Sequence, residues 1–185
     1  MAGGLLTSGT AEAGASDSML ANTCAGCHGT NGAAAGPAMP SIANMDAEIM
    51  VTFMKQYQSG ERPSTIMTRI AKGYEEGELK QIAAYFAKTP WVATNNPTKA
   101  ALVKKGAKLH KKEKCNKCHE ENGRVQSGED LNPRIAGQVP GYLHLMMKNY
   151  QTQEYPDQPK KMIKRLKKMS DQDLEALAHF YASQK

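Results

Sequence analysis

The sequence is poor in aromatic residues and has no long apolar run. Aromatic side chains make up 6% of the 185 residues, with a single Trp and three Phe. No apolar stretch approaches the roughly 20 residues that a membrane-spanning helix needs, which excludes an integral membrane protein. Glycine and proline contents are ordinary and no heptad pattern persists, which excludes collagen-like and coiled-coil chains. So small a supply of large apolar side chains suggests that something other than side chains fills part of the interior.

Cysteine is also scarce, but its placement is informative. The four cysteines form two C-x-x-C-H motifs, the attachment pattern of c-type haem. Two thiols three positions apart can bond the two vinyl groups of one porphyrin, and the adjacent histidine can ligate the iron. The residues concerned are Cys24, Cys27 and His28 in the first motif and Cys115, Cys118 and His119 in the second.

Three other interpretations of the cysteines are weaker. A zinc site built from two C-x-x-C pairs usually separates them by about 15–20 residues, whereas Cys24 and Cys115 are far apart in this chain. A thioredoxin-like dithiol requires a βαβ context, and the surrounding sequence has helical periodicity. Two disulfides between residues three apart would be strained and would leave two equally placed histidines unexplained. The pair of motifs therefore predicts two covalently bound haem c groups.

The charge is unevenly distributed along the chain. The formal net charge is +6, yet residues 1–98 carry 6 basic and 8 acidic side chains, and residues 99–185 carry 18 and 10. The lysines of residues 104–117 and 160–168 surround a haem motif and lack interleaved aromatic residues, so nucleic-acid binding is not expected. They suit a docking face for an acidic redox partner, although they could equally be a solvated surface.

The two halves are repeats of each other. The offset is 91 between the cysteine motifs, 93 between Pro40 and Pro133, and 95 between Leu79 and Leu174, so two small insertions in the second half account for the drift. A proline-containing polar stretch separates the halves. The sequence therefore predicts an N-terminal domain over residues 1–88, a linker over 89–98 and a C-terminal domain over 99–185.

Each repeat is expected to be all-α. A short helix, for which Ser16 or Asp17 is a natural N-cap, leads to the first motif, and Thr98 can cap its counterpart. A middle helix follows the post-motif loop. The last helix has apolar residues at i, i+3, i+4 and i+7, which marks an amphipathic core face. These residues are Leu79, Ile82, Ala83 and Phe86 in the first repeat and Leu174, Leu177, Ala178 and Tyr181 in the second.

The axial ligands of each iron can be sought among residues that both repeats share. His28 and His119 supply one nitrogen each, and their other ring nitrogen should donate to a backbone carbonyl. Pro37 is the candidate acceptor in the first repeat, and the acceptor in the second is open. Matched methionines occur at two places. Met54 and Met147 lie mid-helix and suit the core, whereas Met67 and Met162 lie in the connection before the last helix and are the predicted sixth ligands.

Three further histidines have no counterpart in the other repeat. His110, His144 and His179 are therefore expected at the surface or in packing rather than on iron.

With these residues in place, the sequence resembles the dihaem cytochrome c4-like family, and within it the cytochrome subunits of flavocytochrome c sulfide dehydrogenases. The stretch Pro133-Arg134-Ile135-Ala136-Gly137-Gln138 is a general cytochrome c4-like signature. Residues 64–74, 106–110 and 180–184 point to the sulfide dehydrogenase subunits. The resemblance covers nearly the whole chain, and the lysine-rich segment 104–117 and the N-terminus depart from it.

This resemblance implies two tandem class I cytochrome c domains related by approximate two-fold symmetry, with the haem propionates near each other across the interface. It also implies Met67 and Met162 as axial ligands, in agreement with the repeat. A separate FAD-bearing flavoprotein subunit would oxidise sulfide. This chain would take its electrons one at a time and pass them through two haems to an external acceptor such as a soluble cytochrome c. The chain has no dinucleotide-binding glycine motif, and haem uses all its cysteines, so no catalytic site for sulfide is expected in it.

Two other functions remain open. A free-standing dihaem cytochrome c4-like carrier to a terminal oxidase suits the same fold, and a dihaem enzyme would need one iron with a displaceable ligand. Haem c attachment follows export in bacteria, so the expected compartment is the periplasm. Residues 1–13 could be the tail of an export signal, with a small-residue cleavage site at residues 11–13.

Overall fold

The computed structural model describes residues 15–34, 36–93, 95–156 and 159–185. The expected cleavage site at residues 11–13 lies outside them. The described residues form a helical chain whose only β feature is an isolated bridge between Ser127 and Asn132. The prediction of an all-α fold is confirmed. None of the helices in the described ranges is long and apolar enough to cross a membrane.

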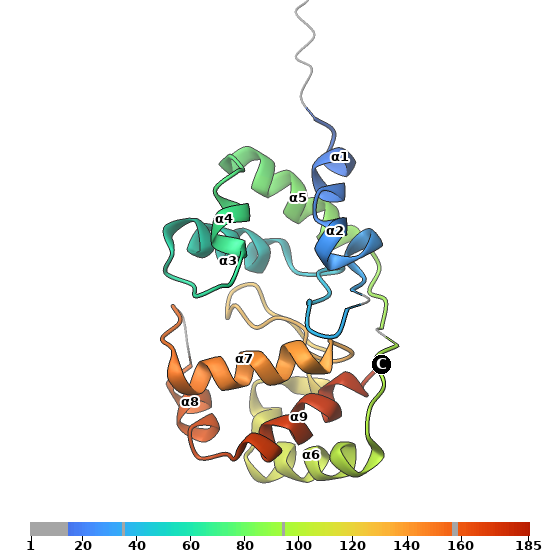
Figure 1. The fold of residues 1–185 in the computed structure, drawn as a ribbon, viewed down its shortest axis with the longest axis vertical. Coiled ribbons are helices and arrows are strands. Elements are labelled where there is room, and N and C mark those ends of the chain that lie inside the picture. Colours follow the sequence, from blue (N-terminus) through green and yellow to red (C-terminus); the bar gives the residue numbers. More distant parts are fainter. Residues whose placement is uncertain (1–14, 35, 94, 157–158) are drawn as a thin grey trace, which may run out of the picture.

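The helices gather into two groups that follow one another along the chain (Figure 1). The first group contains α1 (Asp17–Asn22), α2 (Ala25–His28), the 3-10 helix η1 (Thr30–Gly32), α3 (Ala47–Ser59), α4 (Met67–Ala71) and α5 (Glu76–Lys88). The second contains α6 (Ala100–Lys112), η2 (Cys115–Lys117), η3 (Glu120–Asn122), α7 (Pro140–Thr152), α8 (Lys160–Leu166) and α9 (Asp171–Ala182). We call them the N-terminal and C-terminal halves.

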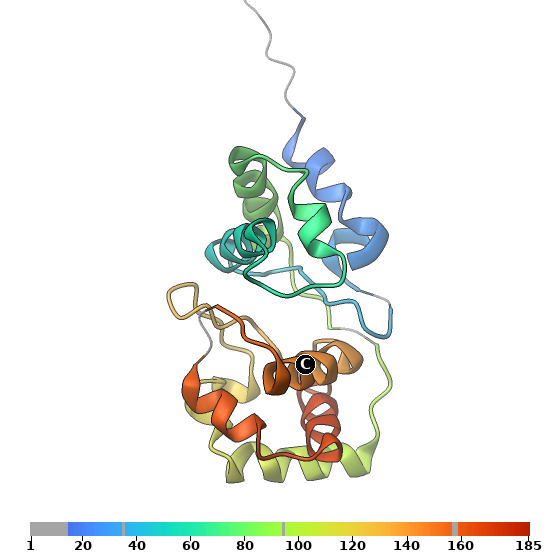
Figure 2. The ribbon, with the colours of Figure 1, turned by 60° about the vertical axis from the view of Figure 1, so that its left-hand side comes forward.

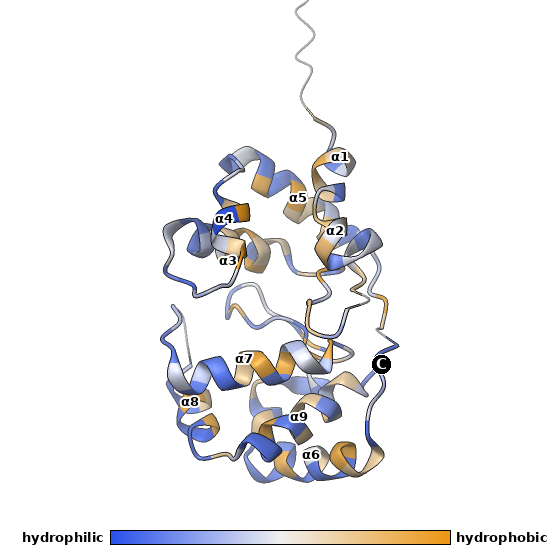
Figure 3. Cartoon of the chain, in the orientation of Figure 1, coloured by the Kyte–Doolittle hydropathy of each residue, from blue (hydrophilic) through white to orange (hydrophobic). Residues whose placement is uncertain are grey.

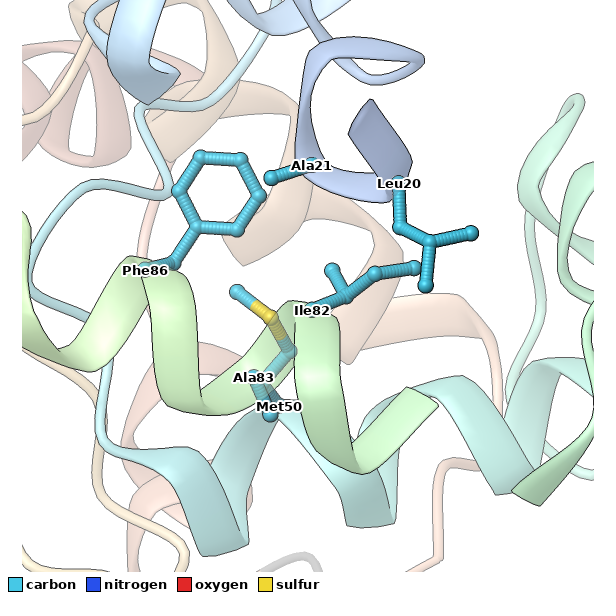
Figure 4. Close-up of a cluster of buried hydrophobic side chains, with 6 residues drawn as sticks. All are labelled: Leu20, Ala21, Met50, Ile82, Ala83 and Phe86. Atoms are coloured by element: carbon cyan, nitrogen blue, oxygen red, sulfur yellow. The ribbon is translucent and has the colours of Figure 1, made fainter. Parts of the chain in front are cut away.

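The expected apolar face of the last helix forms the core of each half. In α5, the side chains of Leu79, Ile82, Ala83 and Phe86 are buried as predicted. They pack against α1 and α3, and Figure 4 shows Phe86, Ile82 and Ala83 facing Leu20, Ala21 and Met50. In α9 the equivalent positions Leu174, Leu177, Ala178 and Tyr181 are buried as well. Hydrophobic and hydrophilic residues alternate along α7 and α9, as expected of amphipathic helices (Figure 3).

The repeat is visible in individual hydrogen bonds. The Gly32 carbonyl accepts from the N–H groups of Ile42 and Ala43, and the Gly123 carbonyl accepts from those of Ile135 and Ala136. Both glycines have positive φ, 73° and 88°, and a Cβ on either would collide with the segment that it binds. The loop after each histidine is therefore closed in the same way in both halves.

The predicted N-cap of the first helix is correct in the N-terminal half and wrong in the C-terminal half. Ser16 is the N-cap of α1, and its hydroxyl accepts a hydrogen bond from the Met19 N–H. The expected cap at Thr98 is wrong, because α6 begins at Ala100 with Lys99 at the N-cap position. Lys99 has no side-chain acceptor to offer. Instead its own backbone N–H donates to the Nδ1 atom of His179 on α9.

The two halves meet through loops as well as helices (Figure 2). In the C-terminal half, the loop after η3 reaches the start of α3, where the Gln126 amide accepts from the Asp46 N–H and donates to the Asn44 carbonyl. In the N-terminal half, the Pro37 carbonyl lies against Gly141 in the first turn of α7, so closely that a Cβ there would overlap it. In each half, the loop after the motif histidine therefore contacts the start of the middle helix of the other half.

Candidate haem-binding sites

Both C-x-x-C-H motifs adopt the same tight turn. The His28 N–H donates to the Cys24 carbonyl and the His119 N–H donates to the Cys115 carbonyl, each over 2.9 Å. The N–H of the second cysteine bonds to the same carbonyl in both, at 3.3 Å for Cys27 and 3.2 Å for Cys118. The two motifs therefore share their backbone hydrogen bonds, although the α-helix α2 includes His28 whereas the 3-10 helix η2 ends at Lys117, before Cys118 and His119.

None of the four thiols takes part in a disulfide. All four cysteines are free, so the disulfide alternative is not supported. Across the described parts of the chain, no three side chains of His, Cys, Asp or Glu gather into a site for a metal ion. Burial raises the pKa of the Cys24 and Cys115 thiols, so both thiols are protonated at physiological pH.

His28 is held by a carbonyl on the loop that follows it. Its Nδ1 atom lies 2.8 Å from the Pro40 carbonyl oxygen. Since a carbonyl can only accept, Nδ1 carries the proton and Nε2 is left free to bind a metal. Burial lowers the pKa of His28, and the hydrogen bond to Pro40 partly opposes this effect. The predicted acceptor, Pro37, is therefore wrong: its carbonyl faces Gly141 of the other half.

His119 has the same place in its motif but a different environment. Its Nδ1 atom is buried without a hydrogen-bond partner among the described residues. Burial, with a smaller contribution from the charge of His110, lowers its pKa to about 4. The ring of Tyr181 lies 6.0 Å away, edge-on. The imidazole is therefore neutral at physiological pH, which is the form that ligates iron.

The predicted methionine ligands lie on two short helices that the sequence analysis treated as loops. Met67 is the first residue of α4, and Met162 lies in the first turn of α8. A glutamine from the middle helix holds the end of each short helix. Gln58 donates to the carbonyls of Ala71 and Tyr74, and Gln151 donates to those of Leu166 and Met169. The two methionines thus occupy equivalent, half-buried positions.

The surface around Met67 is unusually apolar. Ile66 and Ile70, which flank Met67 in the sequence, are 39% and 46% exposed. Large apolar side chains exposed beside a candidate ligand fit a surface that a planar apolar cofactor would cover. The free thiols, the neutral imidazoles and this apolar rim all fit covalently bound haem. Cys24, Cys27, His28 and Met67 would hold one group, and Cys115, Cys118, His119 and Met162 the other.

The second matched pair of methionines and the three unmatched histidines lie where the sequence predicted. Met54 and Met147 pack against the two cores. His110 is buried and its Nδ1 atom lies 3.0 Å from the Tyr181 hydroxyl, while His144 pairs with Asp171 at the surface. His179 accepts the Lys99 N–H.

Comparison with known proteins agrees with this geometry. Residues 13–90 match the family model described as cytochrome c. Cytochrome c-554(548) of Halomonas halodenitrificans is 32% identical over 68 residues, which span 35% of this chain and 82% of that protein. The chain belongs to the cytochrome c family. Covalently bound haem c is thus the cofactor that its motifs serve.

A second relative of this cytochrome c carries a more specific name. The cytochrome subunit of sulfide dehydrogenase from Chlorobaculum tepidum is 43% identical over 68 residues, or 37% of this chain. The chain spans 61% of the length of that subunit. Among solved structures, reduced cytochrome c4 from Pseudomonas stutzeri matches with a TM-score of 0.79 at 22% identity, over 94% of this chain and all of that one. The fold is therefore that of two tandem class I cytochrome c domains.

Two functional features escaped the sequence analysis. One is the buried Gln138, which joins the halves, and the other is the buried Arg62. Neither has an equivalent in the opposite repeat, so a comparison of repeats could not reveal them. Gln138 is the last residue of the signature of residues 133–138, and its place in that signature was the only feature of the sequence that could have drawn attention to it.

Proposed function

We propose that this chain is a dihaem electron-transfer subunit that accepts electrons from the FAD of a sulfide-oxidising flavoprotein and passes them to an external acceptor such as a soluble cytochrome c. The observation that carries the proposal is the repeated motif. Two C-x-x-C-H turns with the same hydrogen bonds each lie in a half that also offers an equivalent methionine. The predicted domains, residues 1–88 and 99–185, each contain one complete set.

Two one-electron sites suit the chemistry of the partner. Oxidation of one sulfide to the level of sulfur releases two electrons, which a flavin can hold as a pair and deliver singly. A haem c in each half accepts one electron at its iron. The protein supplies the thioether anchors, a histidine and a methionine to each site, and Met/His ligation raises the reduction potential. Haem c attachment takes place after export in bacteria, and the proposal therefore places the chain in the periplasm.

The name of the Chlorobaculum tepidum relative supports the sulfide assignment, together with the residues of the 64–74 segment. A free-standing cytochrome c4-like carrier to a terminal oxidase is the second candidate. It is favoured by the match to the Pseudomonas stutzeri structure, which extends over the whole of that chain. The two candidates differ in one respect that can be measured, since only the first requires a flavoprotein partner.

The deciding experiment is the haem-to-flavin ratio of the untagged native protein, purified from its own source. We expect two haems for each flavin and reduction of both haems when sulfide is added. Two haems without flavin, and no response to sulfide, would support the free carrier. Parallel addition of thiosulfate controls for a less specific reductant.

Replacement of Cys27 or Cys118 by Ser tests the sites one by one. Each change removes one thiol of one motif, so each variant should lose one thioether bond. The vinyl group left free should shift the pyridine haemochrome band of one of the two haems and leave that of the other unchanged. An unchanged band in either variant would contradict the assigned attachment site.

A further inference from the structure

Arg62 lies buried at the junction between the two halves. Only 4% of its surface is exposed. Its guanidinium carbon lies 3.6 Å from the ring centre of Phe53 on α3, and 5.3 Å from that of Tyr155, which belongs to the C-terminal half. The residue also lies five positions before Met67, at the start of the segment that carries the predicted ligand.

The surroundings of Arg62 are aromatic and provide no negative charge. Burial raises the pKa of Tyr142, Tyr150 and Tyr155, so these hydroxyls are protonated at physiological pH. The Nη1 atom of Arg62 donates to the side-chain oxygen of Gln56 over 3.2 Å, which is a neutral contact. The aromatic faces attract the cation, but they do not neutralise it.

Two polar atoms at this junction lack partners. Arg62 Nε and the Tyr155 hydroxyl are both buried without a hydrogen bond among the described residues. In the same parts of the chain, no ion pair between Arg62 and an acidic side chain is present. An arginine remains charged in a protein, and a buried charge without a counter-charge is strongly unfavourable. The junction therefore requires an anion that contributes hydrogen-bond acceptors.

We propose that Arg62 and Tyr155 bind haem propionate at this junction, and that Arg62 thereby sets the reduction potential of the haem concerned. The inference rests on the proposed function, since it requires haem in the halves that meet here. A propionate is a carboxylate, and a guanidinium binds a carboxylate with two parallel charge-assisted hydrogen bonds. The positive charge of Arg62 favours the iron state that has gained an electron.

The test is a redox titration of the intact holo-protein with Arg62→Met and Arg62→Lys. Met keeps much of the side-chain volume but removes the charge and the donors, whereas Lys keeps the charge. For Arg62→Met we expect the reduction equilibrium of at least one haem to shift about tenfold towards the oxidised form, which is 59 mV for a one-electron couple. Arg62→Lys should recover most of that shift.

A second readout identifies the propionate. Without Arg62 the pKa of a nearby propionate rises, so the potential of that haem should fall as pH increases through neutrality. The wild-type potential should be flat over the same range. Tyr155→Phe removes only the hydroxyl and should cause a smaller shift in the same direction. Asp157 lies two residues after Tyr155 in the sequence, and Asp157→Asn tests its carboxyl as the counter-charge of Arg62. The effect of Arg62→Met on the potential should be the same with and without Asp157→Asn.

Lys55→Met is the matched control. It removes one positive charge from α3, where Lys55 is paired with Glu76 at the exposed surface, and should change neither the potential nor its pH dependence. Unchanged potentials in Arg62→Met, with two haems bound, would overturn the role of Arg62 and leave the proposed function intact. Fewer than two haems in the wild-type protein would overturn both. If Arg62→Met fails to fold, Tyr155→Phe decides, and unchanged potentials in that variant contradict the proposal.

Discussion

Gln138 and Ser41 join the two halves through a reciprocal pair of hydrogen bonds. The Ser41 N–H donates to the Gln138 side-chain oxygen over 2.8 Å, and the Gln138 amide nitrogen donates to the Ser41 carbonyl over 2.9 Å. Both residues are buried: Gln138 is 4% exposed and Ser41 is 1% exposed. Ser41 directly follows Pro40, whose carbonyl holds His28. The C-terminal half therefore fixes the segment that orients the predicted axial histidine of the N-terminal half.

Replacement of Gln138 by Ala should destabilise the protein by about 2–4 kcal/mol, because it leaves a buried N–H and a buried carbonyl of Ser41 without partners. The midpoint of urea unfolding, followed by far-UV circular dichroism, measures the loss. Gln126→Ala is the control, since it removes the same kind of contact between the halves at a half-buried site. Its effect should be about 1 kcal/mol. Equal losses in the two variants would contradict the special role of Gln138.

Gly106 allows α6 and α9 to approach closely. A Cβ at this position would overlap the Ala176 carbonyl oxygen and approach the Phe180 side chain. Gly106→Ala should therefore cost about 1–3 kcal/mol through overpacking, even though alanine is the better helix former. Gly77→Ala on α5 is the matched control, because nothing lies within 4 Å of its added Cβ. That change should be neutral or stabilise by up to about 1 kcal/mol. Thermal unfolding of both variants measures the difference in sign.

His179 should make the stability depend on pH. Burial lowers its pKa in the folded protein, and the Nδ1 atom must be unprotonated to accept the Lys99 N–H. The unfolded chain binds a proton near pH 6.5, so the free energy of unfolding should fall as pH decreases through that value towards the lower folded pKa. His179→Gln keeps an acceptor but does not titrate. The difference in unfolding free energy between wild type and variant, measured from pH 8 to 5, should shrink as pH falls, and a constant difference would be the contrary result.

Much of the fold and of the candidate site could be predicted from the repeat. The apolar spacing of α5 and α9 located both cores, since burial of a helix face has a period that the sequence displays. The offsets of 91 and 93 match the bonds of Gly32 and Gly123 to their partner segments. The assignment of Met67 and Met162 stays a prediction, although both lie at equivalent places on α4 and α8.

The errors concern contacts between the halves, which have no signal in local periodicity. Pro37 was the wrong acceptor for His28 because its carbonyl lies against Gly141 of the C-terminal half. The repeat paired Pro40 with Pro133, but His119 Nδ1 has no hydrogen-bond partner among the described residues, so the pairing alone could not identify the acceptor. Thr98 was the wrong cap because His179, a residue 80 positions after Lys99, provides the contact at that helix start. Arg62 and Gln138 depend on the same kind of long-range packing.

The haem of the C-terminal half should have the higher reduction potential. That half carries an excess of basic side chains and the other a small acidic excess, and positive charge favours the reduced iron. His28 donates to Pro40, whereas His119 Nδ1 has no acceptor in the described parts of the chain. Such a hydrogen bond makes a ligand more basic and favours the oxidised iron. Spectroelectrochemistry resolves the two potentials, and Met67→His should lower only the smaller one, since loss of Met/His ligation lowers the potential. A shift of the larger potential would reverse the order.

Electrons should leave through the basic C-terminal half, whose lysines would attract an acidic acceptor. Lys104, Lys164 and Lys168 are exposed, whereas Lys105 is bound to Asp173 over 2.7 Å and is not free to dock. The double change Lys164→Glu with Lys168→Glu should slow oxidation of the reduced holo-protein by hexacyanoferrate(III) roughly tenfold at low ionic strength.

Lys72→Glu with Lys88→Glu changes the same amount of charge in the N-terminal half and serves as the control. It should leave the rate of oxidation nearly unchanged. The rates of the two double variants should converge when salt shortens the Debye length to about 3 Å at 1 M, which stopped-flow absorbance can follow. If the control slows oxidation as much as Lys164→Glu with Lys168→Glu does, electrons leave from both halves and the basic surface has no special part in docking.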